Sequence, residues 1–171
     1  EYMGVAKQIL EQRPPFEHSN WFEQLTSGER PGFMQILRSA FYGEPAELQE
    51  LNVESLRRDN WKRVIDVANK YDQPGRFTTF AAFEWSNTPG GSHFHRVAVF
   101  RGPRYPQLPF SALDSRHPED LWRYADAQRM RGIDSVLIPH NSNLSGGLHF
   151  SLNDSYGRPI DRAFAELKAR N

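Results

Sequence analysis

Two side chains that follow short apolar runs carry groups able to bind a metal. Glu84 comes directly after the uncharged run at residues 77–83, and His140 comes directly after the apolar run at residues 136–139. In parallel α/β folds, side chains at the carboxyl ends of neighbouring strands gather on one face. An ionised carboxylate and a neutral imidazole are both good ligands for zinc, manganese or iron. We therefore expect Glu84 and His140 to share a divalent cation and to act as the catalytic pair.

A second imidazole for this site can come from the His-x-His sequence at residues 93–95. If the backbone there is extended, the side chains of His93 and His95 point the same way. His95 begins a predicted strand, whereas His93 lies in a glycine-rich turn. We therefore expect His95, and not His93, to be the third metal ligand.

Polar residues close to the predicted ligands are candidates for contact with a substrate. Asn141 and Asn143 lie in a loop directly after His140, where their amides could donate hydrogen bonds to a substrate oxygen. Arg96, next to His95, is the candidate basic contact. An ordinary turn and a structural arginine explain the same residues, because Asn, Ser and Gly are common in turns.

Two other interpretations of Glu84 stay open. In a metal-independent glycoside hydrolase, Glu84 would be the acid and Trp85 a platform for the sugar, but this chemistry needs two carboxylates. No second acid ends a predicted strand. In a non-catalytic binding or scaffolding module, Glu84 would pair with an arginine and His140 would be a buried histidine with a satisfied ring nitrogen.

The composition excludes several classes of function. The 171 residues include 21 Lys and Arg, 21 Asp and Glu, 6 His and no Cys, so the formal charge is 0 at pH 7. Without a basic cluster, binding to nucleic acid through phosphates is not expected. The absence of cysteine excludes disulfides, iron–sulfur clusters and a thiol nucleophile.

No apolar run in the sequence is long enough to span a membrane. We expect a soluble protein of the cytoplasm or periplasm that acts on a small molecule, and the oligomeric state cannot be inferred.

The pattern of apolar residues predicts a helical first half and alternating strands and helices in the second. Helices are expected at residues 4–12, 33–41, 53–71, 118–130 and 159–170, and Asn52 is the expected cap of the third. Strands are expected at residues 77–83, 95–100 and 134–139, the first of them buried on both faces. The predicted fold is a single α/β domain with a largely parallel sheet. It has a helical part at about residues 1–73 and a core at about residues 74–171. Three strands are too few to close a barrel.

Four stretches of the sequence, in this order, resemble one large family: residues 77–85, 90–101, 118–122 and 138–145. It is the domain-of-unknown-function family three-six-zero-four, which is similar to the PHP (polymerase and histidinol phosphatase) metal-dependent hydrolases. The resemblance implies part of a distorted (β/α) barrel that binds two or three divalent ions. It also implies that Glu84 is a bridging carboxylate, that His140 is a metal ligand, that His95 is a ligand or a substrate contact, and that Asn141 and Asn143 line the pocket.

The chemistry implied by this resemblance is hydrolysis by a metal-activated water, with a phosphate ester as the default substrate. Members of the family are longer, and their further ligands lie outside these residues. The resemblance therefore implies an internal fragment of a larger hydrolase. We expect the 171-residue chain alone to bind metal weakly and to be inactive.

Overall fold

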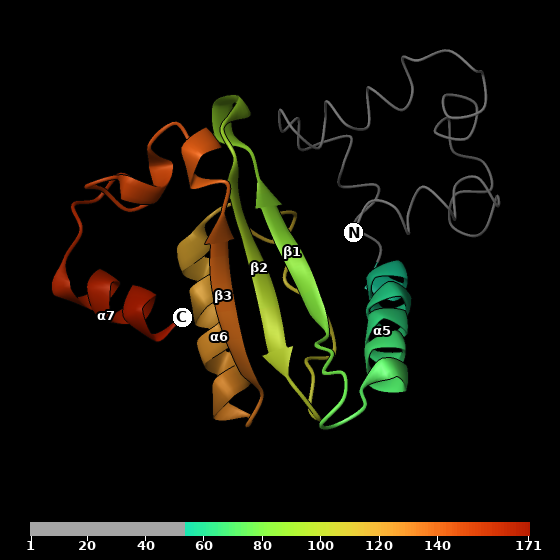
Figure 1. Ribbon diagram of the computed structural model, residues 1–171. Helices are drawn as coiled ribbons and strands as arrows, with labels where there is room; N and C mark the ends of the chain where they lie inside the picture. The colour runs from blue at the N-terminus through green and yellow to red at the C-terminus, as the bar shows by residue number, and fades with distance from the viewer. Residues whose placement is uncertain (1–53) are drawn as a thin grey trace, which may run out of the picture.

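The computed structural model describes residues 54–171 of the chain. The helices expected at residues 4–12 and 33–41 and the cap expected at Asn52 lie outside the described residues. The described part has a mixed α/β architecture, with a three-stranded sheet and three α-helices (Figure 1).

The strands are β1 (Ala82–Asn87), β2 (Phe94–Arg101) and β3 (Asp134–His140), and β2 lies between the other two. Both neighbouring pairs are antiparallel. The prediction of a largely parallel sheet is therefore wrong. Within residues 54–171 the strands form an open sheet, and no part of a closed barrel is seen.

The connection between β1 and β2 explains the antiparallel order. Only residues 88–93 join these strands, and they include the short 3-10 helix Pro89–Gly91. Parallel neighbours need a crossover of about a dozen residues or more, whereas antiparallel neighbours can be joined by a tight turn. Gly90 and Gly91 have φ values of 58° and 83°, in the left-handed region that glycine tolerates. The length of this turn thus fixes the direction of β2.

The first strand begins later than its composition predicts. β1 starts at Ala82, so Glu84 lies within the strand and not after it. Phe77 and Phe80 precede the strand and are 59% and 55% exposed, so burial of this run on both faces was a wrong prediction.

One face of the sheet is covered by α6 (Pro118–Met130), which lies behind the sheet in Figure 1. Proline at its start and acids in its first turn favour this helix, as the sequence predicts. Its Leu121, Trp122 and Ala125 pack in one buried cluster with side chains of the sheet: Trp85, Phe94, Ala98, Phe100 and Leu137. Burial of each large apolar side chain contributes roughly 1.5–3 kcal/mol.

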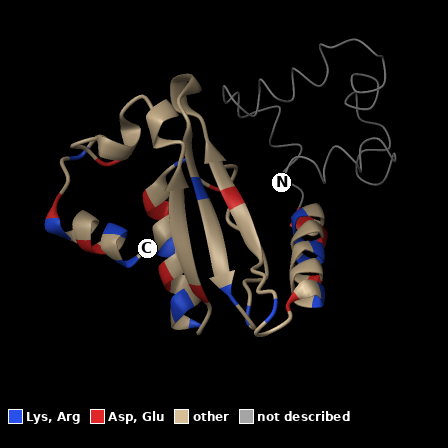
Figure 2. Cartoon of the chain, in the orientation of Figure 1, with Lys and Arg blue, Asp and Glu red and all other residues tan. Residues whose placement is uncertain are grey.

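The other two helices extend this core. In α5 (Glu54–Tyr71), which confirms the predicted helix at residues 53–71, Trp61 contacts the rings of Phe83 and Phe100 edge-on. The last helix, α7 (Arg162–Arg170), is capped by the Asp161 side chain, which accepts a hydrogen bond from the Phe164 backbone N–H. Figure 2 shows that most charged residues lie on the helices and that the strands carry few.

The opposite face of the sheet, called the open face, is not covered by any described helix. Val136 and Ile138 point to the open face and are 52% and 47% exposed. Glu84, His95 and His140 also point to it, because side chains alternate between faces along each strand and the register aligns these positions.

None of the helices described in residues 54–171 has the length and apolar character that crossing a membrane requires.

Candidate metal site on the open face

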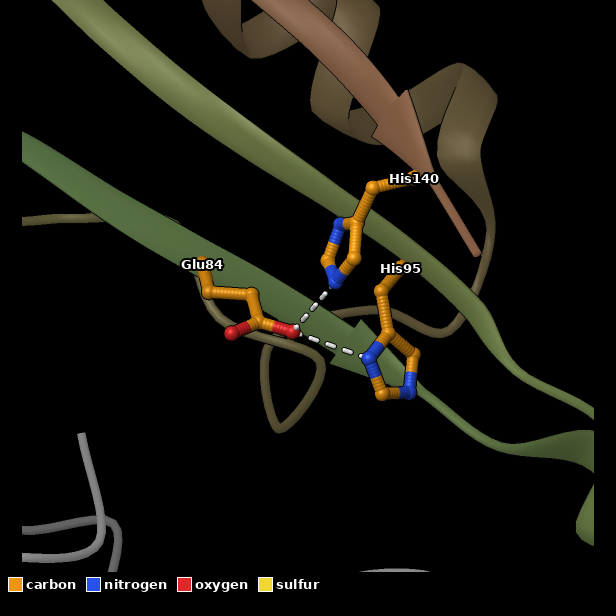
Figure 3. Close-up of side chains that lie close together, drawn as sticks. All are labelled: Glu84, His95 and His140. Atoms are coloured by element: carbon orange, nitrogen blue, oxygen red, sulfur yellow. Dashed lines mark hydrogen bonds and ion pairs between the residues drawn. The ribbon is translucent and has the colours of Figure 1, made fainter. Parts of the chain in front are cut away.

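One side chain from each strand meets at one end of the open face (Figure 3). His95 and His140 are direct partners in the register between β2 and β3. Glu84 is paired with Val97, two residues from His95, and so is the diagonal neighbour of His95. Diagonal neighbours in an antiparallel pair lie within reach of long side chains. The antiparallel register therefore brings together Glu84 and His140, which were expected at the ends of parallel strands, and His95, which was expected at the start of a strand.

The three side chains are close enough to hold a single ion. One ligand atom from each residue lies within 4.8 Å of the other two. The Glu84 Oε1 atom is 2.8 Å from His95 Nδ1 and 3.3 Å from His140 Nε2. Ligands bound tetrahedrally to one zinc ion lie about 3.3–3.6 Å apart. The His140 contact already has this spacing, and the His95 contact has the shorter spacing of a hydrogen bond.

Burial holds His95 in the form that binds metals. The residue is 6% exposed. This burial lowers the pKa of His95 below the ordinary imidazole value and outweighs the nearby Glu84 carboxylate, which raises it. A metal ligand must be the neutral imidazole. The site thus offers a neutral ring at neutral pH.

Two neighbours fix the ring of His95. Its second nitrogen, Nε2, is 3.4 Å from the hydroxyl of Thr88, which is itself buried. The ring of His93 stacks on the His95 ring, with centroids 4.9 Å apart and an angle of 20° between the planes. Metal-binding histidines usually contact a polar group through the nitrogen that does not bind the metal. Thr88 was not predicted from the sequence, although its position at the start of the β1–β2 turn was visible there.

The site is open to solvent on one side. The side chains of Glu84 and His140 are 45% and 31% exposed, whereas that of His95 is 8% exposed. His140 Nδ1 is buried and has no hydrogen-bond partner among residues 54–171. Two imidazoles and one carboxylate match a catalytic zinc site, in which three protein ligands leave a position for water or substrate. The residues therefore fit a divalent cation.

The structure does not bring all the predicted substrate contacts to this site. Asn141 and Asn143 lie in the exposed loop after β3, and Asn141 has a left-handed φ of 54°. Neither amide forms a hydrogen bond with the three candidate ligands. Arg96 points to the opposite face, because it is adjacent to His95 in β2. Alternation along the strand predicted at residues 95–100 already places Arg96 opposite His95, and the expectation of a substrate contact did not take this into account.

Trp85 is not available as a sugar platform. It is fully buried on the face covered by α6, and its indole N–H donates a hydrogen bond to the Ser115 carbonyl at 3.0 Å. The geometry therefore removes the aromatic contact that the glycoside hydrolase interpretation required.

Comparison with known proteins identifies the family. A family model described as "Protein of unknown function (DUF3604)" matches residues 1–171. The chain belongs to this family. Neither a curated protein nor a solved structure matches the DUF3604 chain.

Proposed function

We propose that Glu84, His95 and His140 hold a divalent metal in a PHP-like hydrolase that activates water against a small substrate, with a phosphate ester as the default. The observation that carries the proposal is the approach of the three ligand atoms to within 4.8 Å of one another. A cluster of exposed acidic groups alone would be weak support for a metal site, because such groups are common without a bound ion. Here two imidazoles join the carboxylate, and one of them is buried.

Each residue of the site has a role that follows from its surroundings. His95 is the rigid ligand, because it is buried and held between Thr88 and His93. His140 presents Nε2 from the end of β3 and faces the solvent side. Glu84 supplies the negative charge that offsets part of the charge of a divalent ion. Its carboxylate, which is the most exposed of the three groups, can also accept a proton from a bound water.

A bound divalent ion would supply one thing that these residues lack. It lowers the pKa of water from 15.7 to roughly 7 and polarises the oxygen of the bond to be cleaved. The side chains of the DUF3604 chain would bind and orient the ion, and the open face would admit the substrate.

Metal titration of variants tests the site itself. Zinc and manganese binding to the 171-residue chain is measured by calorimetry for wild type, Glu84→Gln, His95→Asn and His140→Asn. His117→Asn is the matched control, because His117 lies at the start of α6 and contacts Ser155 and Tyr156. We expect each of the three site variants to weaken binding by about tenfold or more and the control to keep it. Equal binding by all variants would reject the site.

The reaction is tested on the longest natural chain that carries these residues. Hydrolysis of a panel of phosphate esters is assayed before and after chelation, and then after zinc, manganese or iron is restored. We expect activity to disappear with the metal and to return with it, and Glu84→Gln to stay inactive. Activity that survives chelation would contradict the proposal. Metal-dependent uptake of oxygen would do so too, because two histidines and one carboxylate also hold iron in oxygenases.

A further inference from the structure

A second group of polar atoms lies on the other side of the sheet, away from the candidate metal site. Arg96 is 5% exposed, although it carries a guanidinium. The guanidinium lies over the rings of Phe94, Trp85 and Trp122, at 4.6, 5.9 and 5.7 Å from their centroids. These contacts stabilise a cation, but a ring face does not replace a hydrogen-bond acceptor.

Arg96 shares a cavity with another polar group that lacks a partner. Arg96 Nη1 and His149 Nε2 are both buried, and neither has a hydrogen-bond partner among residues 54–171. Both residues line the same cavity of about 390 Å³. A buried polar group without a partner costs about 1–3 kcal/mol, and a charged group costs more. One bound molecule with acceptor oxygens would satisfy both atoms.

The buried acid of this region does not supply that acceptor. Glu119 is 2% exposed and accepts hydrogen bonds from the backbone N–H and the hydroxyl of Ser155. Its charge acts on Arg96 only at a distance. Burial lowers the pKa of Arg96 to about 10, and Glu119 partly opposes this shift, so the guanidinium is charged at neutral pH.

The field around His149 is positive. Burial, together with the charges of Arg96, Lys168, His140 and His95, lowers the pKa of His149 to about 4. His149 is therefore a neutral ring at neutral pH, and its Nε2 can donate a hydrogen bond in one of its two tautomers. Lys168, on the exposed side of α7, also lines the cavity.

The rest of the cavity wall has an apolar part and a polar part, and the polar part includes Arg116 and Asp154. The apolar part is lined by Phe94, Trp122, Leu148, Ile160 and Phe164. The volume is at the small end of the range for ligand pockets, which is roughly 300–1,000 Å³. Such a wall suits a molecule with an apolar body and one charged end.

We propose that the cavity between the sheet, α6 and α7 binds a small organic carboxylate, with its charged end at Arg96 Nη1 and His149 Nε2 and its apolar body against Trp122 and Phe164. Lys168 attracts the carboxylate at the rim. A singly charged acid fits better than a phosphate, because Glu119 already offsets part of the positive charge. The residues proposed to bind the carboxylate are not the three candidate metal ligands, which lie on the open face, although His95 and His140 act electrostatically on His149.

Binding of three related probes tests this site. Phenylacetate, its uncharged analogue phenylacetamide and acetate, which lacks the apolar body, are titrated into the 171-residue chain in the presence of a chelator. Calorimetry or saturation-transfer NMR gives the affinity. We expect saturable binding of phenylacetate. Binding of the other two probes should be at least about tenfold weaker, because phenylacetamide lacks the charge and acetate lacks the apolar body.

Variants of exposed lysines provide a test that does not perturb the core. Lys168→Gln is expected to weaken phenylacetate binding several-fold, and Lys70→Gln, at the exposed end of α5, is the matched control with no expected change. Arg96→Met is expected to abolish binding if the variant folds. The proposal is overturned if phenylacetate does not bind, if phenylacetamide binds equally well, or if Lys168→Gln behaves like the control. Inorganic phosphate that binds as tightly as phenylacetate would also overturn it.

Discussion

At the scale of single residues, His95 is the side chain on which the candidate metal site depends. It is the most buried of the three proposed ligands, and its Nδ1 is 2.8 Å from the Glu84 carboxylate. The other ring nitrogen, Nε2, contacts the Thr88 hydroxyl. The Thr88 contact at Nε2 keeps the orientation of the ring when Nδ1 exchanges the Glu84 carboxylate for an ion.

Removal of the Thr88 hydroxyl tests this support. Thr88→Val keeps the shape of the side chain but removes the oxygen 3.4 Å from His95 Nε2. We expect zinc affinity to fall by about tenfold, because the contact orients the ligand ring. Thr78→Val, at an exposed position before β1, is the control. Unchanged affinity in Thr88→Val would show that the hydroxyl does not position the ring.

The titration of His149 predicts how stability changes with pH. Burial lowers the pKa of His149 to about 4, below its ordinary value of 6.5. Between these values the unfolded chain binds the extra proton, so the free energy of unfolding decreases as the pH falls from 6.5 towards 4. We expect His149→Gln to show a shallower pH dependence than wild type in urea denaturation without added metal. Identical slopes would contradict this assignment.

At the scale of secondary structure, the elements were easier to predict from the sequence than their directions. The helices at residues 54–71 and 118–130 were predicted nearly to the residue, because apolar spacing, the proline at Pro118 and the first-turn acids are local signals. The strand direction depends on connections. The connection at residues 88–93 is too short for a parallel crossover, and the prediction of a largely parallel sheet overlooked this signal. The path of residues 102–117, which returns the chain to the start of α6, left no local signal.

The grouping of Glu84, His95 and His140 was predicted for a reason that proved wrong. Glu84 and His140 were expected at the ends of parallel strands, whereas Glu84 lies within β1. The three still meet, because β1 and β3 both run antiparallel to β2 and end beside its beginning. The orientation of Arg96 away from His95 followed from the strand predicted at residues 95–100, since adjacent residues of a strand point to opposite faces, but the prediction of a substrate contact did not apply this alternation.

Leu137 and Ile138 are neighbours in β3 that face opposite sides of the sheet, so we expect their substitution to reduce stability by different amounts. Leu137 is 7% exposed and packs in the core, whereas Ile138 is 47% exposed on the open face. We expect Leu137→Ala to reduce the free energy of unfolding by about 2–4 kcal/mol and Ile138→Ala by less than about 1 kcal/mol. Urea denaturation of the two variants measures both. Similar costs would show that the open face is covered in solution.

At the scale of the whole molecule, the described chain supplies three candidate ligands on an exposed sheet. A catalytic zinc site can be made of three protein ligands, but sites with two or three ions need more. The proposed relation to PHP hydrolases requires such additional ligands, and within residues 54–171 the group of ligand atoms close to one another consists of Glu84, His95 and His140.

We therefore predict that the 171-residue chain binds zinc weakly and does not hydrolyse phosphate esters. Equilibrium dialysis against zinc and an assay with a chromogenic phosphate ester measure the two properties. Tight stoichiometric binding together with turnover would show that the three ligands are sufficient and that no additional segment is required.

The most direct test of the metal site is to locate the ion in a crystal. Anomalous diffraction at the zinc absorption edge, from crystals of the 171-residue chain grown with excess zinc, gives the position of the metal without reference to activity. The predicted result is a peak within about 2.0–2.2 Å of Glu84 Oε1, His95 Nδ1 and His140 Nε2. A saturated crystal with zinc only at other positions, or with none, would contradict the assignment of these residues as ligands.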